Sequence, residues 1–127
     1  QTVEAFWNSV RHDKPFAIGF ICALGAELMR PHIAEISRYA DTLVAAYPNA
    51  GLPNEMGEYD EKPHETCGKV CSWAQDGIVN ILGGCCGTTP AHVAALAEAI
   101  QGIKPRDTAP TKNSMRLAGL EPFEVAS

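Results

Sequence analysis

Hydrophobic residues follow two different patterns along the chain. Three short continuous apolar runs, FAIGFIC, LVAAY and IVNIL, occupy residues 16–22, 43–47 and 78–82. Runs of this length between turn-forming residues are typical of strands that are buried on both faces. Elsewhere, apolar residues recur every three or four positions, which is the spacing of an amphipathic helix. The pattern therefore predicts that buried strands alternate with helices.

Four segments have the helical spacing, and they cover residues 2–12, 27–40, 63–75 and 90–100. The last of them has the clearest limits. Thr89 is a good N-cap, Pro90 suits a first helical turn, and Gly102 suits the residue after a helix end.

These elements form a helix followed by three strand-helix repeats, which indicates a parallel sheet with right-handed crossovers. We therefore expect an α/β fold, and in particular a partial (β/α)8 barrel with parallel strands. A complete barrel needs eight units and about 250 residues, so about five units would lie upstream of Gln1. The first residue is Gln rather than Met, which fits an internal piece of a longer chain. The alternative architecture is a small open three-layer sheet.

The composition narrows the class of protein. The chain has 127 residues, 46% of them hydrophobic and 20% charged, which matches one globular domain. Its net charge of -5 comes without a cluster of Lys or Arg, so nucleic acid and anionic membranes are poor partners. No apolar run approaches the roughly 20 residues that span a bilayer, and no secretory leader opens the chain. We expect a cytoplasmic protein without a membrane partner.

The chain has five cysteines, an odd number that argues against a disulfide framework and favours metal or thiol chemistry. Cys22 follows the first predicted strand, and the adjacent Cys85 and Cys86 follow the third. Active sites of α/β proteins lie at this end of the strands. Parallel neighbours are about 4.8 Å apart, so a curved sheet lets the three sulfurs converge on one ion.

Adjacent cysteines in a regular strand point to opposite faces, so both bind one ion only if the backbone leaves the pleat there. The flanking glycines Gly83, Gly84 and Gly87 permit this. Soft thiolates select Zn, Cu(I) or iron-sulfur clusters, and three protein ligands with one open position are expected of catalytic zinc. A vicinal disulfide between Cys85 and Cys86 is the competing interpretation, although it needs an oxidising compartment.

Other polar positions have a structural and a functional interpretation. Cys67 and Cys71 lie on the apolar stripe of their helix, which favours the core. Asn49 lies in Pro-Asn-Ala-Gly, typical of a turn, but it follows the second strand and is a candidate weak oxygen ligand. Thr88 and the start of the last helix are a minor candidate for binding a carboxylate.

The histidines and one long loop are expected to be solvated. All four histidines fall at helix ends or exposed faces, which favours solvent over metal, and they are His12, His32, His64 and His92. We expect the loop residues Glu58, Tyr59 and Asp60 to be exposed to solvent. Contact with an amino-acid substrate is the less favoured interpretation.

Three motifs resemble the homocysteine-binding domain of the cobalamin-dependent methionine synthases: GFICALG at 19–25, YPNAGLP at 47–53 and NILGGCCGTTP at 80–90. The resemblance covers nearly the whole chain. The tail RLAGLEPFEV also resembles the lead-in to the folate-binding module of those enzymes. The resemblance therefore implies the last three strand-helix units of the barrel over 1–104 and a linker toward a folate-binding module over 105–127.

The resemblance also implies a chemistry. Cys22, Cys85 and Cys86 are the expected zinc ligands, homocysteine sulfur takes the open position, and Asn49 fills that position when substrate is absent. Methylcobalamin on another module would donate the methyl group and methyl-tetrahydrofolate would supply it, and the partners would be the remaining barrel and these modules. The chain departs from the family at Ile21, where Asn is usual.

The expected function is methyl transfer to zinc-activated homocysteine, forming methionine, with this chain inactive by itself. Residues that hold the amino and carboxylate groups of homocysteine would lie largely outside the chain. Two alternatives stay open: a cobalamin-independent homocysteine S-methyltransferase, and a non-catalytic α/β fragment with structural or redox cysteines.

Overall fold

The computed structural model describes residues 1–125, apart from the side chains of residues 23 and 24. The last two residues of the predicted linker, 126 and 127, therefore lie outside the described residues. Helix α1 (Val3–Val10) opens the chain and continues into a 3-10 turn at Arg11–Asp13. The other elements are β1 (Ala17–Gly25), α2 (Ala26–Ser37), β2 (Leu43–Asn49), α3 (Pro63–Gln75), β3 (Ile81–Leu82), α4 (Pro90–Ala99), β4 (Arg116–Ala118) and β5 (Pro122–Glu124).

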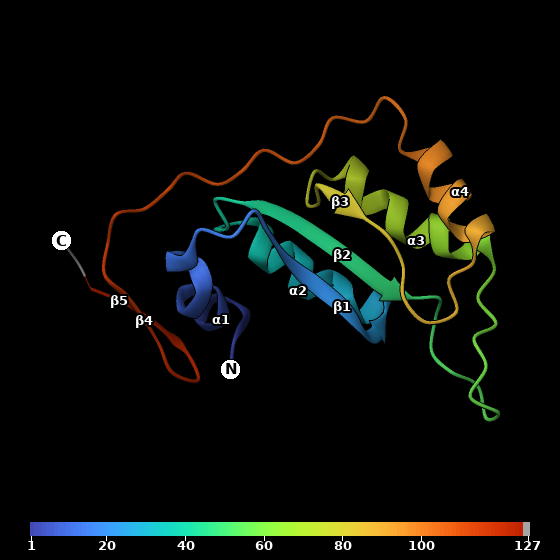
Figure 1. Ribbon diagram of the computed structural model, residues 1–127, viewed down its shortest axis with the longest axis horizontal. Coiled ribbons are helices and arrows are strands. Elements are labelled where there is room, and N and C mark those ends of the chain that lie inside the picture. Colours follow the sequence, from blue (N-terminus) through green and yellow to red (C-terminus); the bar gives the residue numbers. More distant parts are fainter. Residues whose placement is uncertain (126–127) are drawn as a thin grey trace.

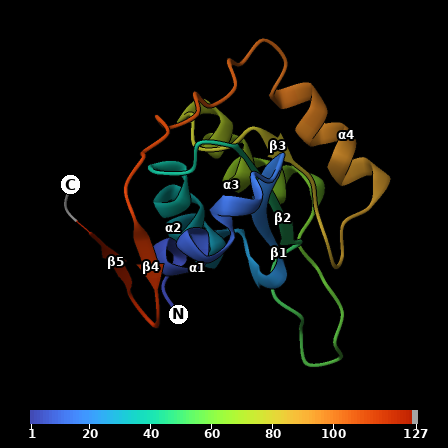
Figure 2. The same cartoon turned by 60° about the vertical axis from the view of Figure 1, so that its left-hand side comes forward.

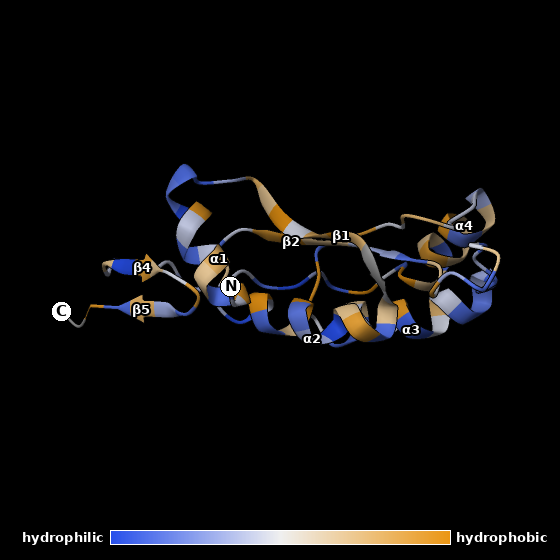
Figure 3. Cartoon of the chain, turned by 90° about the horizontal axis from the view of Figure 1, so that it is seen from below, coloured by the Kyte–Doolittle hydropathy of each residue, from blue (hydrophilic) through white to orange (hydrophobic). Residues whose placement is uncertain are grey.

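The first three strands form one parallel sheet in the order β1-β2-β3 (Figure 1). Helices α2 and α3 lie on the same face of this sheet (Figure 3). On the other face, Ala17, Gly19, Ile21, Ala45 and Tyr47 line an open hollow. Two helices on one face fit a segment of barrel wall, because the inner face of a barrel normally packs against the other strands. A three-layer sheet would instead have helices on both faces. The predicted partial α/β barrel is confirmed.

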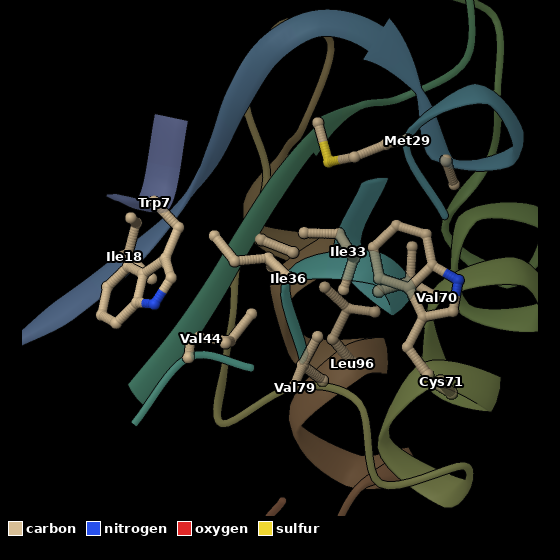
Figure 4. Packing of buried hydrophobic residues seen from close by; sticks show 14 residues of the cluster. Trp7, Ile18, Met29, Ile33, Ile36, Val44, Val70, Cys71, Val79 and Leu96 are labelled. Carbon is tan, nitrogen blue, oxygen red and sulfur yellow. The ribbon is translucent and has the colours of Figure 1, made fainter. Parts of the chain in front are cut away.

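The hydrophobic core lies between the strands and the helices that cover them (Figure 4). Ile33 and Ile36 of α2, Val44 of β2 and Val70 of α3 are completely buried there. Helical spacing predicts that Leu28 also points inward, but Leu28 is 52% exposed while its neighbour Met29 is buried.

The third strand is shorter than the apolar run that predicts it, because only Ile81 and Leu82 join the ladder. Asn80 replaces the missing strand residues with its side chain. The side-chain Oδ1 of Asn80 accepts the backbone N–H of Val44 at 3.0 Å, and the backbone N–H of Asn80 donates to the Val44 carbonyl at 2.8 Å. The polar Asn80 thus extends the pairing of β2 without continuing the strand.

The segment after α4 crosses back over the molecule and ends in the β4-β5 hairpin. This hairpin lies beside α1 in both views (Figures 1 and 2). The side chain of Asn8 donates to the Leu117 carbonyl at 3.3 Å, and the guanidinium of Arg11 donates to the Ser114 carbonyl at 2.7 Å. The two ends of the chain therefore pack together. In the part of the chain that the structure describes, no helix is long and apolar enough to cross a membrane.

Replacing Gly68 with alanine is expected to stabilise the chain by about 0.5–1 kcal/mol, because glycine weakens a helix interior. Gly68 lies within α3, and an added Cβ would meet nothing within 4 Å. Urea unfolding measures the change. Gly77→Ala is the control with the opposite sign, since Gly77 has a φ of +69° that alanine adopts only with strain. A loss of stability in Gly68→Ala would contradict the packing described here.

Candidate metal centre

Three cysteine sulfurs meet at the end of the sheet where the parallel strands have their carboxyl ends. Sγ of Cys22 lies 3.5 Å from Sγ of Cys86, which lies 3.9 Å from Sγ of Cys85. All three sulfurs lie within 4.8 Å of one another, and all three residues are half-buried. The predicted convergence of Cys22, Cys85 and Cys86 is therefore present in the structure.

A break in strand β1 directs Cys22 into this cluster. Up to Ile21 the register with β2 is regular, but Gly25 then pairs with Asn49, so residues 22–24 stand opposite Pro48 alone. Proline has no N–H to donate to the ladder, which allows this bulge. Cys22 itself has a φ of 63°, a left-handed conformation that is uncommon outside glycine. Such strain is found mainly where a function requires it.

The loop that carries Cys85 and Cys86 is attached to the end of β2, as the two segments lie side by side in Figure 1. The amide of Cys85 donates to the Pro48 carbonyl at 3.0 Å, and the Cys86 carbonyl accepts the amide of Ala50 at 2.9 Å. The amide of Cys86 donates to Oδ1 of Asn49 at 3.1 Å. These three bonds hold both cysteines outside any strand, as binding to a single ion requires.

Asn49 is the last residue of β2 and only 3% exposed. The turn expected at 48–51 is shorter than predicted, because Pro48 and Asn49 still belong to β2 and the chain bends only at 50 and 51. Because its Oδ1 already accepts the Cys86 amide, Asn49 fixes the position of the cysteine loop. An amide oxygen has a second lone pair, so a role as exchangeable fourth ligand stays a prediction.

The spacing of the sulfurs fits tetrahedral zinc. Zn–S bonds of about 2.3 Å place two tetrahedral ligands about 3.8 Å apart, close to the observed 3.5 and 3.9 Å. A disulfide needs an S–S distance near 2.05 Å, so Cys85 and Cys86 do not form the vicinal disulfide considered above. The three sulfurs converge, and among the described residues no fourth cysteine or histidine joins them. This ligand set matches a catalytic rather than a structural zinc site.

The thiol of Cys85 resists ionisation without a cation. The pKa of Cys85 is raised to about 11, first by its hydrogen bond with Cys22 and then by burial and Cys86. Three thiolates so close together repel one another, and a divalent cation removes that repulsion. The arrangement is therefore suited to a soft divalent metal.

Among the loop residues Glu58, Tyr59 and Asp60, only Tyr59 lies beside the cysteine loop. Burial, and then the nearby Cys86, raises the pKa of Tyr59. Tyr59 also packs on Gly87, where an added Cβ would lie 2.7 Å from Tyr59 Cγ. Glu58 and Asp60 are exposed, as the default interpretation predicts.

The prediction for His92 is wrong. His92 is only 5% exposed and joins the last helix to the loop before α3. Its Nε2 donates to the Glu61 carbonyl at 2.7 Å, while Nδ1 accepts the amide of Thr89 at 3.2 Å. The Thr89-x-x-His92 spacing has the form of a capping box, and that signal was available in the sequence.

The remaining candidates do not belong to the group of three converging sulfurs. Cys71 is buried and Cys67 packs against the core, which confirms their structural interpretation, and their sulfurs lie 2.9 Å apart. Thr88 has a buried hydroxyl without a partner among the described residues, and it packs against Gly84. Ile21, where the family usually has Asn, is 67% exposed on the open face of the sheet.

Comparison with known families agrees with this geometry. The family model described as homocysteine S-methyltransferase matches residues 1–100. The match contains the parallel sheet, the bulge of β1 and all three clustered cysteines. Because it covers most of the 127 residues, the chain belongs to the homocysteine S-methyltransferase family.

Proposed function

We propose that this chain supplies the zinc-thiolate centre at which homocysteine is methylated to methionine. The observation that carries the proposal is the convergence of three cysteine sulfurs at the carboxyl ends of parallel strands, in a chain of the homocysteine S-methyltransferase family. Cys22, Cys85 and Cys86 would hold the metal and leave one position open for the substrate sulfur.

The charge of the ligands explains why such a site favours nucleophilic sulfur. A free thiol with a pKa near 8.5 is only a few per cent thiolate at neutral pH. Coordination to Zn²⁺ deprotonates a thiol outright. With Zn²⁺ bound, the three cysteine thiolates would give the site a formal charge of -1, and a homocysteine thiolate would make it -2. Electron density would then stay on sulfur, which is what attack on a methyl group requires.

The source of the methyl group is a second part of the proposed function. The resemblance of residues 80–90 and of the tail RLAGLEPFEV to cobalamin-dependent methionine synthases supports methylcobalamin, with methyl-tetrahydrofolate as its source. We propose that the rest of the barrel and both cofactor modules lie in the parent chain, so the isolated 127-residue chain does not turn over. Methionine formation by the isolated chain would contradict this.

The free cysteines also support a cytoplasmic location, because disulfides are rare there.

The zinc-loaded chain is expected to give an X-ray absorption spectrum with three sulfur ligands, rising to four when excess L-homocysteine is added. L-homoserine is the matched control ligand, because it replaces the thiol with a hydroxyl and keeps the amino-acid part. It should leave the sulfur count at three. Absence of zinc from chain purified under reducing conditions, or a sulfur count that homocysteine does not change, would refute the proposed function.

A further inference from the structure

Cys67 and Cys71, the two cysteines outside the candidate metal centre, have sulfurs only 2.9 Å apart. They lie four residues apart within α3, and such positions share one face of a helix. Both residues are free thiols. The proposed zinc chemistry does not use this pair, but two adjacent thiols are what a dithiol-disulfide couple requires.

The two thiols differ in their access to solvent. Cys71 is 6% exposed and belongs to the hydrophobic core (Figure 4). Cys67 is half-buried and lines an open hollow between α3 and α4, beside Gly68 and Ala95. Burial, and then the hydrogen bond with Cys67, raises the pKa of Cys71 to about 12, so Cys71 keeps its proton at neutral pH. A reagent in solution therefore meets Cys67 first, with Cys71 directly behind it.

Helix geometry makes a disulfide between these residues possible but strained. Side chains four positions apart on a helix have Cβ atoms about 5–6 Å apart, whereas a disulfide needs about 3.5–4.5 Å. The turn must therefore tighten when the bond forms. Gly68 lies within this turn, and a glycine inside a helix makes departure from helical geometry less costly. Strained disulfides are easily reduced again, which suits a reversible reaction.

We propose that Cys67 and Cys71 form a reversible dithiol-disulfide couple on α3, separate from the metal centre and oxidised by small disulfides. Cys67 is the attacking thiol of the couple and Cys71 is the resolving thiol. The inference goes beyond the proposed function and does not depend on it. Transient disulfides with a redox-sensing role are the kind that occurs in reducing compartments.

The reaction balances with a low-molecular-weight disulfide, such as glutathione disulfide, as the co-reactant. The thiolate of Cys67 attacks one sulfur of that disulfide, which releases one small thiolate and leaves a mixed disulfide on Cys67. Cys71 then loses its proton to solvent and attacks the Cys67 sulfur, which releases the second small thiolate. Two protein thiols and one small disulfide thus become one protein disulfide and two small thiols.

The test treats the full chain, in the presence of zinc, with glutathione disulfide and then with excess reduced glutathione. After the free thiols are blocked, trypsin and an endoproteinase that cuts before aspartate leave Cys67 within residues 60–69 and Cys71 within residues 70–75. Each is then the only cysteine of its peptide. Mass spectrometry should find these two peptides joined after oxidation and separate after reduction.

Gly68→Ala tests the geometry without changing either sulfur. Because alanine favours the helical turn, the equilibrium constant for disulfide formation against glutathione should fall about two- to fivefold. Gly119→Ala is the matched control, since its added Cβ also meets nothing within 4 Å but lies in the β4-β5 hairpin. It should leave the constant unchanged.

Cys71→Ala removes the resolving thiol, so Cys67 should accumulate as its mixed disulfide with glutathione. Glutathione on Cys67 of the wild-type chain without any joined peptides would overturn the inference, and so would two unmodified cysteines. Zinc content does not enter this measurement. Failure of the chain to bind zinc would therefore refute the proposed function and leave the dithiol couple standing.

Discussion

Replacing Arg106 with alanine is expected to lower the free energy of unfolding by at least about 3 kcal/mol, since a hydrogen bond to a charged group contributes about 1.5–3 kcal/mol. Arg106 is only 4% exposed, and its guanidinium fills a site lined by carbonyl groups. It donates to the carbonyls of Ala40 at 2.6 Å, Ser37 at 2.9 Å and Thr42 at 2.9 Å. Small domains have only about 5–15 kcal/mol of stability in total, so the loss is large.

The physical reason is that several groups depend on this one cation. The Ser37 carbonyl lies at the end of α2, where a helix leaves carbonyls without partners and a positive charge is favourable, and Ala40 follows three residues later. Burial lowers the pKa of Arg106, but a guanidinium stays charged in proteins. Truncation would leave the carbonyls of Ser37 and Thr42 without this donor, whereas the Ala40 carbonyl would keep only the amide of Ala109 at 3.1 Å.

Urea unfolding of Arg106→Ala tests the prediction against Arg30→Ala. Arg30 forms a half-exposed ion pair with Asp76 at 2.6 Å, which should be worth less than about 1 kcal/mol. Arg106→Lys should recover little of the loss, because one ammonium does not reproduce the planar set of donors. Similar losses in Arg106→Ala and Arg30→Ala would contradict the structural role of Arg106.

Replacing Cys86 with serine is expected to remove most of the bound zinc. Serine offers a neutral hydroxyl in place of a soft thiolate, which zinc binds far less well. The loss of affinity should exceed the roughly 10–100-fold that follows loss of an outer-shell partner. Zinc content under reducing conditions and chelator competition measure the effect.

Cys67→Ser is the matched control for that experiment. Cys67 is also half-buried beside another sulfur, 2.9 Å from that of Cys71, but it lies outside the cluster. Its replacement should leave one zinc per chain with unchanged affinity. If Cys86→Ser kept its zinc, or if Cys67→Ser lost it to the same degree, the assignment of the metal centre would be wrong.

Much of the fold is predictable because its signals are local. The helix at Pro63–Gln75 has the predicted limits, since its spacing, its first proline and the glycine that follows it are all close in sequence. The parallel order of three strands follows from their alternation with helices. The short β3 was not predictable, because the ladder ends where the side chain of Asn80 bonds to Val44, a residue far away in sequence.

The same distinction applies to the charged and polar residues of the interior. Nothing near Arg106 in sequence indicates burial, because all of its acceptors come from residues 37–42 and Asn80. His92 has a capping spacing, but its second partner, Glu61, lies in another loop. Whether a polar group can be buried depends on its hydrogen-bond partners, and partners that are distant in sequence leave no local pattern.

The sequence by itself predicted which three cysteine sulfurs converge and the end of the sheet where they lie. Only the tertiary structure decided how they meet. In a regular strand Cys22 would share the helix-covered face with Ile18 and Phe20, and the bulge opposite Pro48 turns it toward Cys86. Likewise, the approach of Tyr59 depends on the missing side chain of Gly87. Spacing along the chain predicts which face a residue shares, whereas the direction of a side chain at a bulge depends on contacts between separate strands and loops.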